Sequence, residues 1–187
     1  MPSSTVELAR ALIGATLLRT TPEGVASGRI VEVEAYPPGD PASHAYIGLR
    51  PRTVAMFGAS GRAYVYRIYG TSWCFNVTSE AEGVGAAVLV RALEPLEGLD
   101  LMARRRLTDR VRDLCRGPGR LCTALAIDRS LDGADLATDP RIALLPGTAP
   151  GRIGTSVRIG IAKAAGRRLR FYLRGSPYLS GPKRLSP

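Results

Sequence analysis

The pattern of hydrophobic and polar positions predicts many short strands and few helices. Apolar residues recur at helical spacing after Ser4, where Ser4 and Glu7 have the spacing of a capping box, and Gly14 ends that helix. Strands are predicted over 15–19, 29–36, 62–69, 73–78, 86–91, 141–145, 157–161 and 169–173, and further helices over 96–110 and 120–127. Because strands outnumber helices and do not alternate with them, an α+β fold is expected. No linker or repeat divides the chain, so residues 1–187 are expected to form a single domain.

Two of these strands are separated only by a short turn that contains Gly70, so they are expected to pair as a β-hairpin. Tyr64 and Tyr66 share one face of the first strand, and Tyr69 lies where that strand meets the turn. An exposed aromatic tip could enter between bases of a nucleic acid. Taken alone, the pattern slightly favours the alternative, in which Tyr69 folds back onto the core.

Charge adds information about the partner. Of the 187 residues, 45% are hydrophobic and 22% are charged, which is compatible with a soluble core, and the formal net charge is +10. This surplus of positive charge favours a nucleic acid partner. The chain has neither an apolar run of about 18 residues nor a secretion signal, so we expect no membrane segment and a cytoplasmic, nucleoid-associated location. With one histidine, His44, and three scattered cysteines, neither a metal nor another cofactor is expected.

Candidate chemistry lies on the second predicted strand. Glu32, Glu34 and Tyr36 share one of its faces, at the end of the strand, where they could form a site. On pattern alone, an exposed polar face over a buried apolar face is favoured. Arg91 ends another apolar strand, and an arginine in that position usually needs an acidic partner. Glu94 is the candidate partner nearby in sequence, and Glu34 is a distant one.

Seven sequence blocks, taken together and in order, resemble the alkyladenine (3-methyladenine) DNA glycosylase family. They are GRIVEVEAY at 28–36, DPASH at 40–44, MFG at 56–58, YVYRIYG at 64–70, VLVRALEP at 88–95, GPGRLC at 117–122 followed by ALAI at 124–127, and RFYLRGSP at 170–177. A single block is a weak signal, but seven in this order across nearly the whole chain are highly specific. The resemblance implies a curved antiparallel sheet with flanking helices and a protruding hairpin that inserts into DNA.

The resemblance also implies roles for individual residues. Glu34 matches the catalytic carboxylate that orients the attacking water, and Arg91 matches the arginine that helps to hold this water. Tyr36, His44 and Tyr66 match the residues that sandwich a flipped base. The site is therefore expected to combine a charged catalytic pair with an aromatic base-binding pocket.

Two further matches concern selectivity and DNA distortion. Asn76 matches a pocket asparagine that disfavours the 2-amino group of normal guanine, and Tyr69 matches the residue that intercalates where the base has left. The implied protein is a monomeric, monofunctional DNA glycosylase of base excision repair, which acts on double-stranded DNA. Its implied substrates are 3-methyladenine, 7-methylguanine, hypoxanthine and ethenoadenine. Strand cleavage would need an amine nucleophile, and neither Lys163 nor Lys183 lies in a matched block. A third candidate is the amine that removal of Met1 would leave on Pro2, but the resemblance implies attack by water alone.

An alternative is a non-catalytic module that binds damaged DNA or RNA. Such a module would account for the positive charge and the aromatic hairpin. It would leave the carboxylate of Glu34 without a role, and for this reason the enzyme is favoured.

Overall fold

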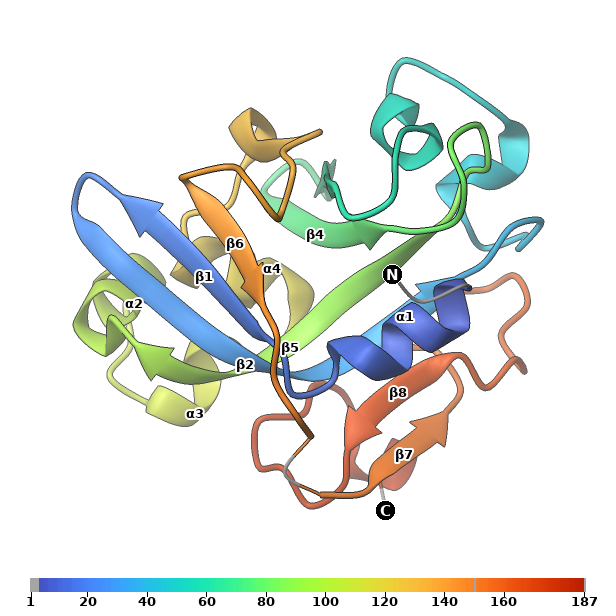
Figure 1. The fold of residues 1–187 in the computed structure, drawn as a ribbon. Helices are drawn as coiled ribbons and strands as arrows, with labels where there is room; N and C mark the ends of the chain where they lie inside the picture. The colour runs from blue at the N-terminus through green and yellow to red at the C-terminus, as the bar shows by residue number, and fades with distance from the viewer. Residues whose placement is uncertain (1–3, 150, 187) are drawn as a thin grey trace.

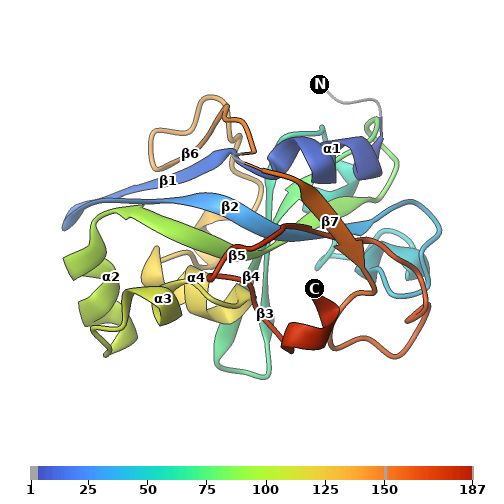
Figure 2. The same ribbon diagram turned by 90° about the horizontal axis from the view of Figure 1, so that it is seen from below.

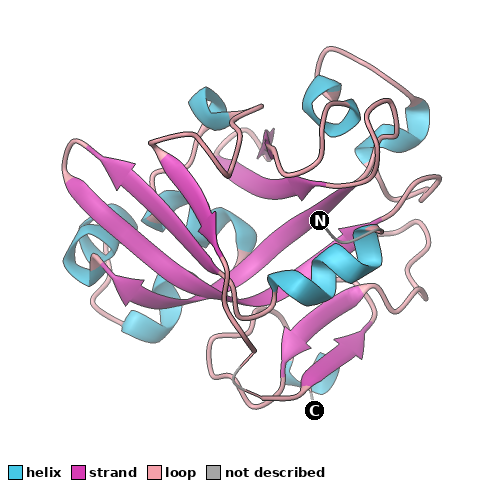
Figure 3. Ribbon diagram, in the orientation of Figure 1, coloured by secondary structure: helices cyan, strands magenta, loops and turns pink. Residues whose placement is uncertain are grey.

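The structure, a computed structural model, describes residues 4–149 and 151–186 and is dominated by one curled sheet (Figures 1 and 3). The strands are β1 (Thr16–Thr21), β2 (Gly24–Tyr36), β3 (Ala63–Ile68), β4 (Ser72–Thr78), β5 (Ala87–Glu97), β6 (Ile142–Leu145), β7 (Ile153–Ser156) and β8 (Arg170–Leu173). The α-helices are α1 (Thr5–Leu12), α2 (Leu99–Arg106), α3 (Val111–Leu114) and α4 (Pro118–Ala124). Short 3-10 helices are η1 (His44–Ile47), η2 (Val54–Phe57), η3 (Arg129–Leu131) and η4 (Lys183–Leu185).

The long strand β2 organises the sheet. All of the strand pairs are antiparallel, in the order β3-β4-β5-β2-β1-β6, and β8 joins β2 to β7. Along one edge β2 pairs with β5, and along the other edge it pairs first with β1 and then with β8. The second half of β2 is therefore enclosed between β5 and β8. The α+β class and the curved antiparallel sheet expected from the sequence are confirmed.

Helices cover both faces of the sheet, as Figure 2 shows with α1 on one side and α2, α3 and α4 on the other. Helix α1 begins as predicted, with the Ser4 hydroxyl accepting a hydrogen bond from the backbone N–H of Glu7 at 3.3 Å, and it buries Leu8 and Leu12. Because both faces of β2 are covered, its polar face is not exposed. Glu32 and Glu34 are 0% exposed, so the exposed face favoured by pattern alone is wrong.

Two predicted elements differ from the structure. The predicted helix 96–110 is shorter, because β5 continues through Glu97 and α2 spans only Leu99–Arg106. Gly98 separates the two elements with φ of 73°, and a side chain there would collide with the Val25 carbonyl. The predicted strand 157–161 is wrong, since the strand in this region is β7 at Ile153–Ser156 and the chain then bends. Within the described part of the chain, no helix could cross a bilayer.

Candidate active site

A pocket of about 240 Å³ lies beside β2, β3, β4 and β5. Its lining includes four aromatic side chains, one amide and two guanidiniums, from Tyr36, His44, Tyr64, Tyr66, Asn76, Arg52 and Arg91. Pockets for drug-sized ligands usually measure about 300–1,000 Å³. The smaller volume and the aromatic lining suit one planar ring system.

A break in strand pairing directs Arg91 toward the acidic side chains of β2. Glu32 pairs with Ala92 and Val33 pairs with Val90, so Arg91 lies at a bulge with no paired residue of its own. Bulges of this kind change the direction of a side chain. The Arg91 Nη1 atom lies 3.3 Å from Glu34 Oε2, and its Nε atom lies 3.2 Å from Glu32 Oε1.

The partner of Arg91 is therefore the distant Glu34 together with Glu32. The nearby candidate Glu94 is wrong, because it pairs instead with Arg29 at 2.9 Å. Burial alone lowers the pKa of Arg91, but the facing carboxylates of Glu34 and Glu32 outweigh it, and the pKa lies above its ordinary value. Arg91 is a permanent cation at the pocket wall.

Glu34 lies behind the pocket wall with most of its acceptor capacity used. Its Oε1 atom accepts the backbone N–H of Ile159 at 2.7 Å, and its Oε2 atom accepts the Tyr36 hydroxyl at 2.9 Å. With the Arg91 contact, three donors address this carboxylate. Ionised carboxylates have about four lone-pair sites. One acceptor site of Glu34 is therefore unfilled, and all three of its partners line the pocket.

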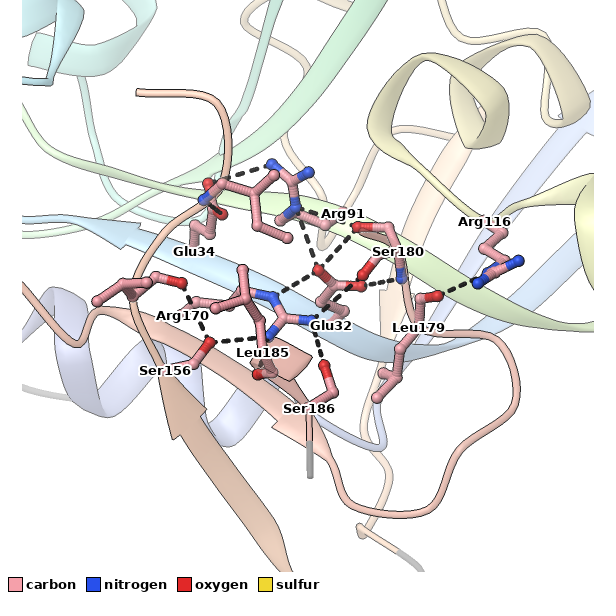
Figure 4. Close-up of polar contacts among 12 residues, drawn as sticks. Glu32, Glu34, Arg91, Arg116, Ser156, Arg170, Leu179, Ser180, Leu185 and Ser186 are labelled. Atoms are coloured by element: carbon pink, nitrogen blue, oxygen red, sulfur yellow. Dashed lines mark hydrogen bonds and ion pairs between the residues drawn. The ribbon is translucent and has the colours of Figure 1, made fainter. Parts of the chain in front are cut away.

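The other side of β2 supplies a second guanidinium. Arg170 of β8 is 0% exposed, and its Nε atom donates to Glu32 Oε1 at 2.7 Å (Figure 4). Two carboxylates, from Glu32 and Glu34, thus face two guanidiniums, from Arg91 and Arg170. Each carboxylate of this buried cluster thus has at least one guanidinium partner.

The aromatic wall is built from η1 and β3. His44 Nδ1 lies 2.9 Å from the Tyr64 hydroxyl, and the His44 ring meets the Tyr66 ring edge-on at 4.5 Å. Burial, with a smaller contribution from Arg52, lowers the pKa of His44, and burial raises the pKa of Tyr64 to about 12. Burial also raises the pKa of Tyr66. These rings are therefore uncharged near neutral pH.

Tyr36 is fixed from two directions. Its hydroxyl binds Glu34, and the Arg158 guanidinium lies 4.5 Å from the centre of its ring. Arg158 is fully buried, forms an ion pair with Asp40 and donates to the Ala35 carbonyl at 3.0 Å. These contacts tie the segment after Ser156 to the end of β2 and to the residues that follow it.

Asn76 and Tyr69 occupy different parts of the β3–β4 hairpin. Asn76 is buried in the pocket lining, where its Nδ2 donates to the Tyr64 carbonyl at 3.0 Å. Tyr69 is at the tip, 87% exposed, so the alternative in which it folds back onto the core is wrong. The tip is a tight turn in which Tyr69 and Gly70 have φ of 51° and 69°, and the Thr71 N–H donates to the Ile68 carbonyl. A left-handed conformation is costly for tyrosine.

The structure thus brings six of the seven predicted site residues to one place and leaves Tyr69 at the hairpin tip. Sequence reasoning missed Arg158 and Arg170 as parts of the site's support. The available signal was the one used for Arg91, an arginine within an apolar run that needs a buried acidic partner. In the described residues, no three His, Cys, Asp or Glu side chains are grouped so that they could hold a metal ion.

Comparisons with known proteins identify the family. The sequence model of the methylpurine-DNA glycosylase (MPG) family matches residues 1–177. A protein of Mesorhizobium japonicum is 54% identical over 186 residues, which cover 99% of this chain and 89% of that protein. A protein of Methanoculleus marisnigri is 50% identical over 180 residues, covering 94% and 93%. Both are named "Putative 3-methyladenine DNA glycosylase". The chain belongs to the methylpurine-DNA glycosylase family and is an enzyme of the DNA glycosylase class.

Proposed function

We propose that this enzyme flips a damaged purine into the aromatic pocket and hydrolyses its N-glycosidic bond with a water molecule held by Glu34 and Arg91. The observation that carries the proposal is the unfilled acceptor site of the buried Glu34 carboxylate, beside a pocket with room for one base. A base inside the duplex cannot reach such a pocket, so it must leave the stack first.

The carboxylate serves the reaction in two ways. As the bond between the sugar C1′ atom and the base nitrogen breaks, its electron pair leaves with the base and positive charge develops on the sugar. The fixed negative charge of Glu34 stabilises this charge. Water oxygen then bonds to C1′, and Glu34 accepts the proton that the water loses.

The pocket selects by stacking and by shape. Tyr36, His44 and Tyr66 offer aromatic faces or edges to a purine, and each stacked base–aromatic contact contributes roughly 1–3 kcal/mol. Cationic lesions such as 3-methyladenine and 7-methylguanine gain a further cation–π attraction. The neutral lesions hypoxanthine and ethenoadenine rely on stacking and on the buried polar groups. Asn76 disfavours the 2-amino group of normal guanine.

The function is tested by single-turnover assays on duplexes that each contain one of these four lesions, with undamaged DNA and RNA as controls. Alkali-labile abasic sites in the damaged duplexes, at the lesion only, are the expected result. Binding without abasic product would favour the non-catalytic module. A preference for RNA over every damaged duplex would favour an RNA-binding module.

We further propose that Tyr69 enters the space left by the flipped base. Tyr69→Asn tests this, because asparagine tolerates the left-handed turn and removes only the ring. Affinity for a duplex with an abasic-site analogue is expected to fall about tenfold, within the range of one lost stacking contact. Fluorescence anisotropy measures the affinity. Thr71→Ala in the same turn is the matched control and should bind like wild type. Unchanged affinity of Tyr69→Asn would contradict the insertion.

A further inference from the structure

Arg91 has a third partner, which comes from the C-terminal part of the chain. The Ser180 hydroxyl lies 3.3 Å from Arg91 Nε and donates to Glu32 Oε1 at 2.8 Å (Figure 4). Ser180 is only 5% exposed. The family model matches residues 1–177, so Ser180 lies just beyond the matched residues.

Glu32 is directed entirely toward protein groups. It accepts from Arg91 Nε, from Arg170 Nε, and from both the backbone N–H and the hydroxyl of Ser180. Three of these donors address Oε1, and the backbone N–H of Ser180 addresses Oε2. Glu32 is also absent from the pocket lining. Any effect of Glu32 on the reaction must therefore pass through a neighbour, and Arg91 is the neighbour that lines the pocket.

The way in which Arg91 divides its donors matters for the reaction. Arginine tends to bind a carboxylate with two parallel N–H groups. Here Arg91 directs Nη1 to Glu34, while its Nε is held by Glu32 and Ser180. A two-pronged contact with Glu34 would occupy the acceptor site that the attacking water needs. A two-pronged contact that includes Nη1 would also use Nη2, and holding Nε limits the rotation of the guanidinium that would bring Nη2 to Glu34.

We propose that Glu32 and Ser180 are positioning residues, which hold Arg91 at Nε so that Glu34 keeps an acceptor site for water. The inference rests on the proposed roles of Glu34 and Arg91. Residues 180–186 reach this place because the buried Arg170 binds the Leu185 carbonyl at 2.9 Å and the Ser186 hydroxyl at 2.8 Å. The C-terminal segment thereby completes the surroundings of the catalytic pair.

The test compares two buried serines of the same network. Ser180→Ala removes the hydroxyl that contacts Arg91 and Glu32. Ser156→Ala is the matched control, because Ser156 is 6% exposed and binds Arg170 at 2.8 Å without contacting Arg91 or Glu32 in the described structure. We expect Ser180→Ala to lower the single-turnover rate about tenfold, as for a lost hydrogen bond to a charged group. Its affinity for damaged duplex, and both properties of Ser156→Ala, should stay within about twofold of wild type.

A second background separates positioning from a general structural effect. Lysine in place of Arg91 keeps the cation and removes the Nε–H group, so Ser180→Ala should change the rate of Arg91→Lys by less than about twofold. An equal loss in both backgrounds, or an equal loss in Ser156→Ala, would overturn the inference.

An NMR measurement tests the same contact without turnover. The ¹⁵N–¹H signal of Arg91 Nε, assigned by its absence in Arg91→Lys, should shift in Ser180→Ala and stay in place in Ser156→Ala. If wild type cleaves, Glu34→Gln does not, and Ser180→Ala matches wild type in rate and signal, only the positioning inference fails. If wild type forms no abasic product from any duplex, the proposed function fails, and the Nε signal alone decides whether Ser180 holds Arg91.

Discussion

Glu34→Gln is expected to lower the single-turnover rate of base excision by about 1,000-fold while the affinity for damaged duplex stays within about threefold. Removal of a positioned general base typically costs a factor of about 10²–10⁴. Glutamine has nearly the same shape but no charge, so it neither stabilises the developing positive charge on the sugar nor accepts the proton of the water. Rates are measured with enzyme in excess, and affinity is measured on an uncleavable duplex.

A matched carboxylate provides the control for this substitution. Glu94 lies on β5 and pairs with Arg29 at 2.9 Å, away from the pocket lining. Glu94→Gln removes one charge by the same chemical change and should cleave at the wild-type rate. The amide introduced by Glu34→Gln would place its N–H groups against one of the groups that donate to the carboxylate in wild type. A melting curve must therefore show that the variant is folded at the assay temperature. A folded Glu34→Gln variant within tenfold of wild type would exclude Glu34 as the catalytic base.

Local patterns were sufficient for features that local chemistry determines. The capping residues of α1 and the β3–β4 hairpin follow from short stretches of sequence, and both were predicted. The end of β5 was not, because Leu96 and Glu97 suit a helix start as well as a strand end, and pairing with β2 decides between them. At the end of β5, a tertiary contact therefore overrides the local sequence preference.

Burial of the acidic side chains could not be derived from the alternation in β2. That alternation is compatible with an exposed polar face. In the structure Glu34 accepts the N–H of Ile159 and Glu32 accepts the N–H of Ser180, so segments far along the sequence help to cover both carboxylates. The choice between Glu34 and Glu94 for Arg91 likewise depended on strand register and on a bulge, which no periodicity reveals. Family resemblance supplied Glu34, whereas the geometry explains why Arg91 reaches it.

The buried arginines show where more could have been predicted. Arg158 and Arg170 each lie among apolar residues near the C-terminal end of the sequence, and both have acidic partners more than 100 positions away. The sequence shows that such a partner is needed, because an unpaired buried cation is very costly. The sequence does not show which carboxylate becomes the partner. That choice depends on how β8 and the segment after β7 pack against β2 and against the residues that follow β2.

Arg170→Met is expected to lower the free energy of unfolding by about 3–5 kcal/mol, since one member of a buried ion cluster is removed and the rest stays behind. Methionine fills much of the same volume, but Glu32 and Glu34 then share Arg91 as the single cation of the cluster. In addition, the Leu185 carbonyl and the Ser186 hydroxyl lose the hydrogen bonds that Arg170 donates. Chemical denaturation with urea measures the change. Arg174→Met, at an exposed position just after β8, is the matched control and should change stability by less than about 0.5 kcal/mol.

A double variant identifies the cause of this loss. If the cost of Arg170→Met comes from an uncompensated carboxylate, then Glu32→Gln in the same chain removes that charge, and the double variant should be clearly more stable than the sum of the two single losses predicts. Additive losses would instead assign the effect to packing and to the hydrogen bonds of the C-terminal segment. A loss below about 1 kcal/mol for Arg170→Met alone would show that the cluster tolerates net negative charge, which contradicts the balance of two carboxylates and two guanidiniums.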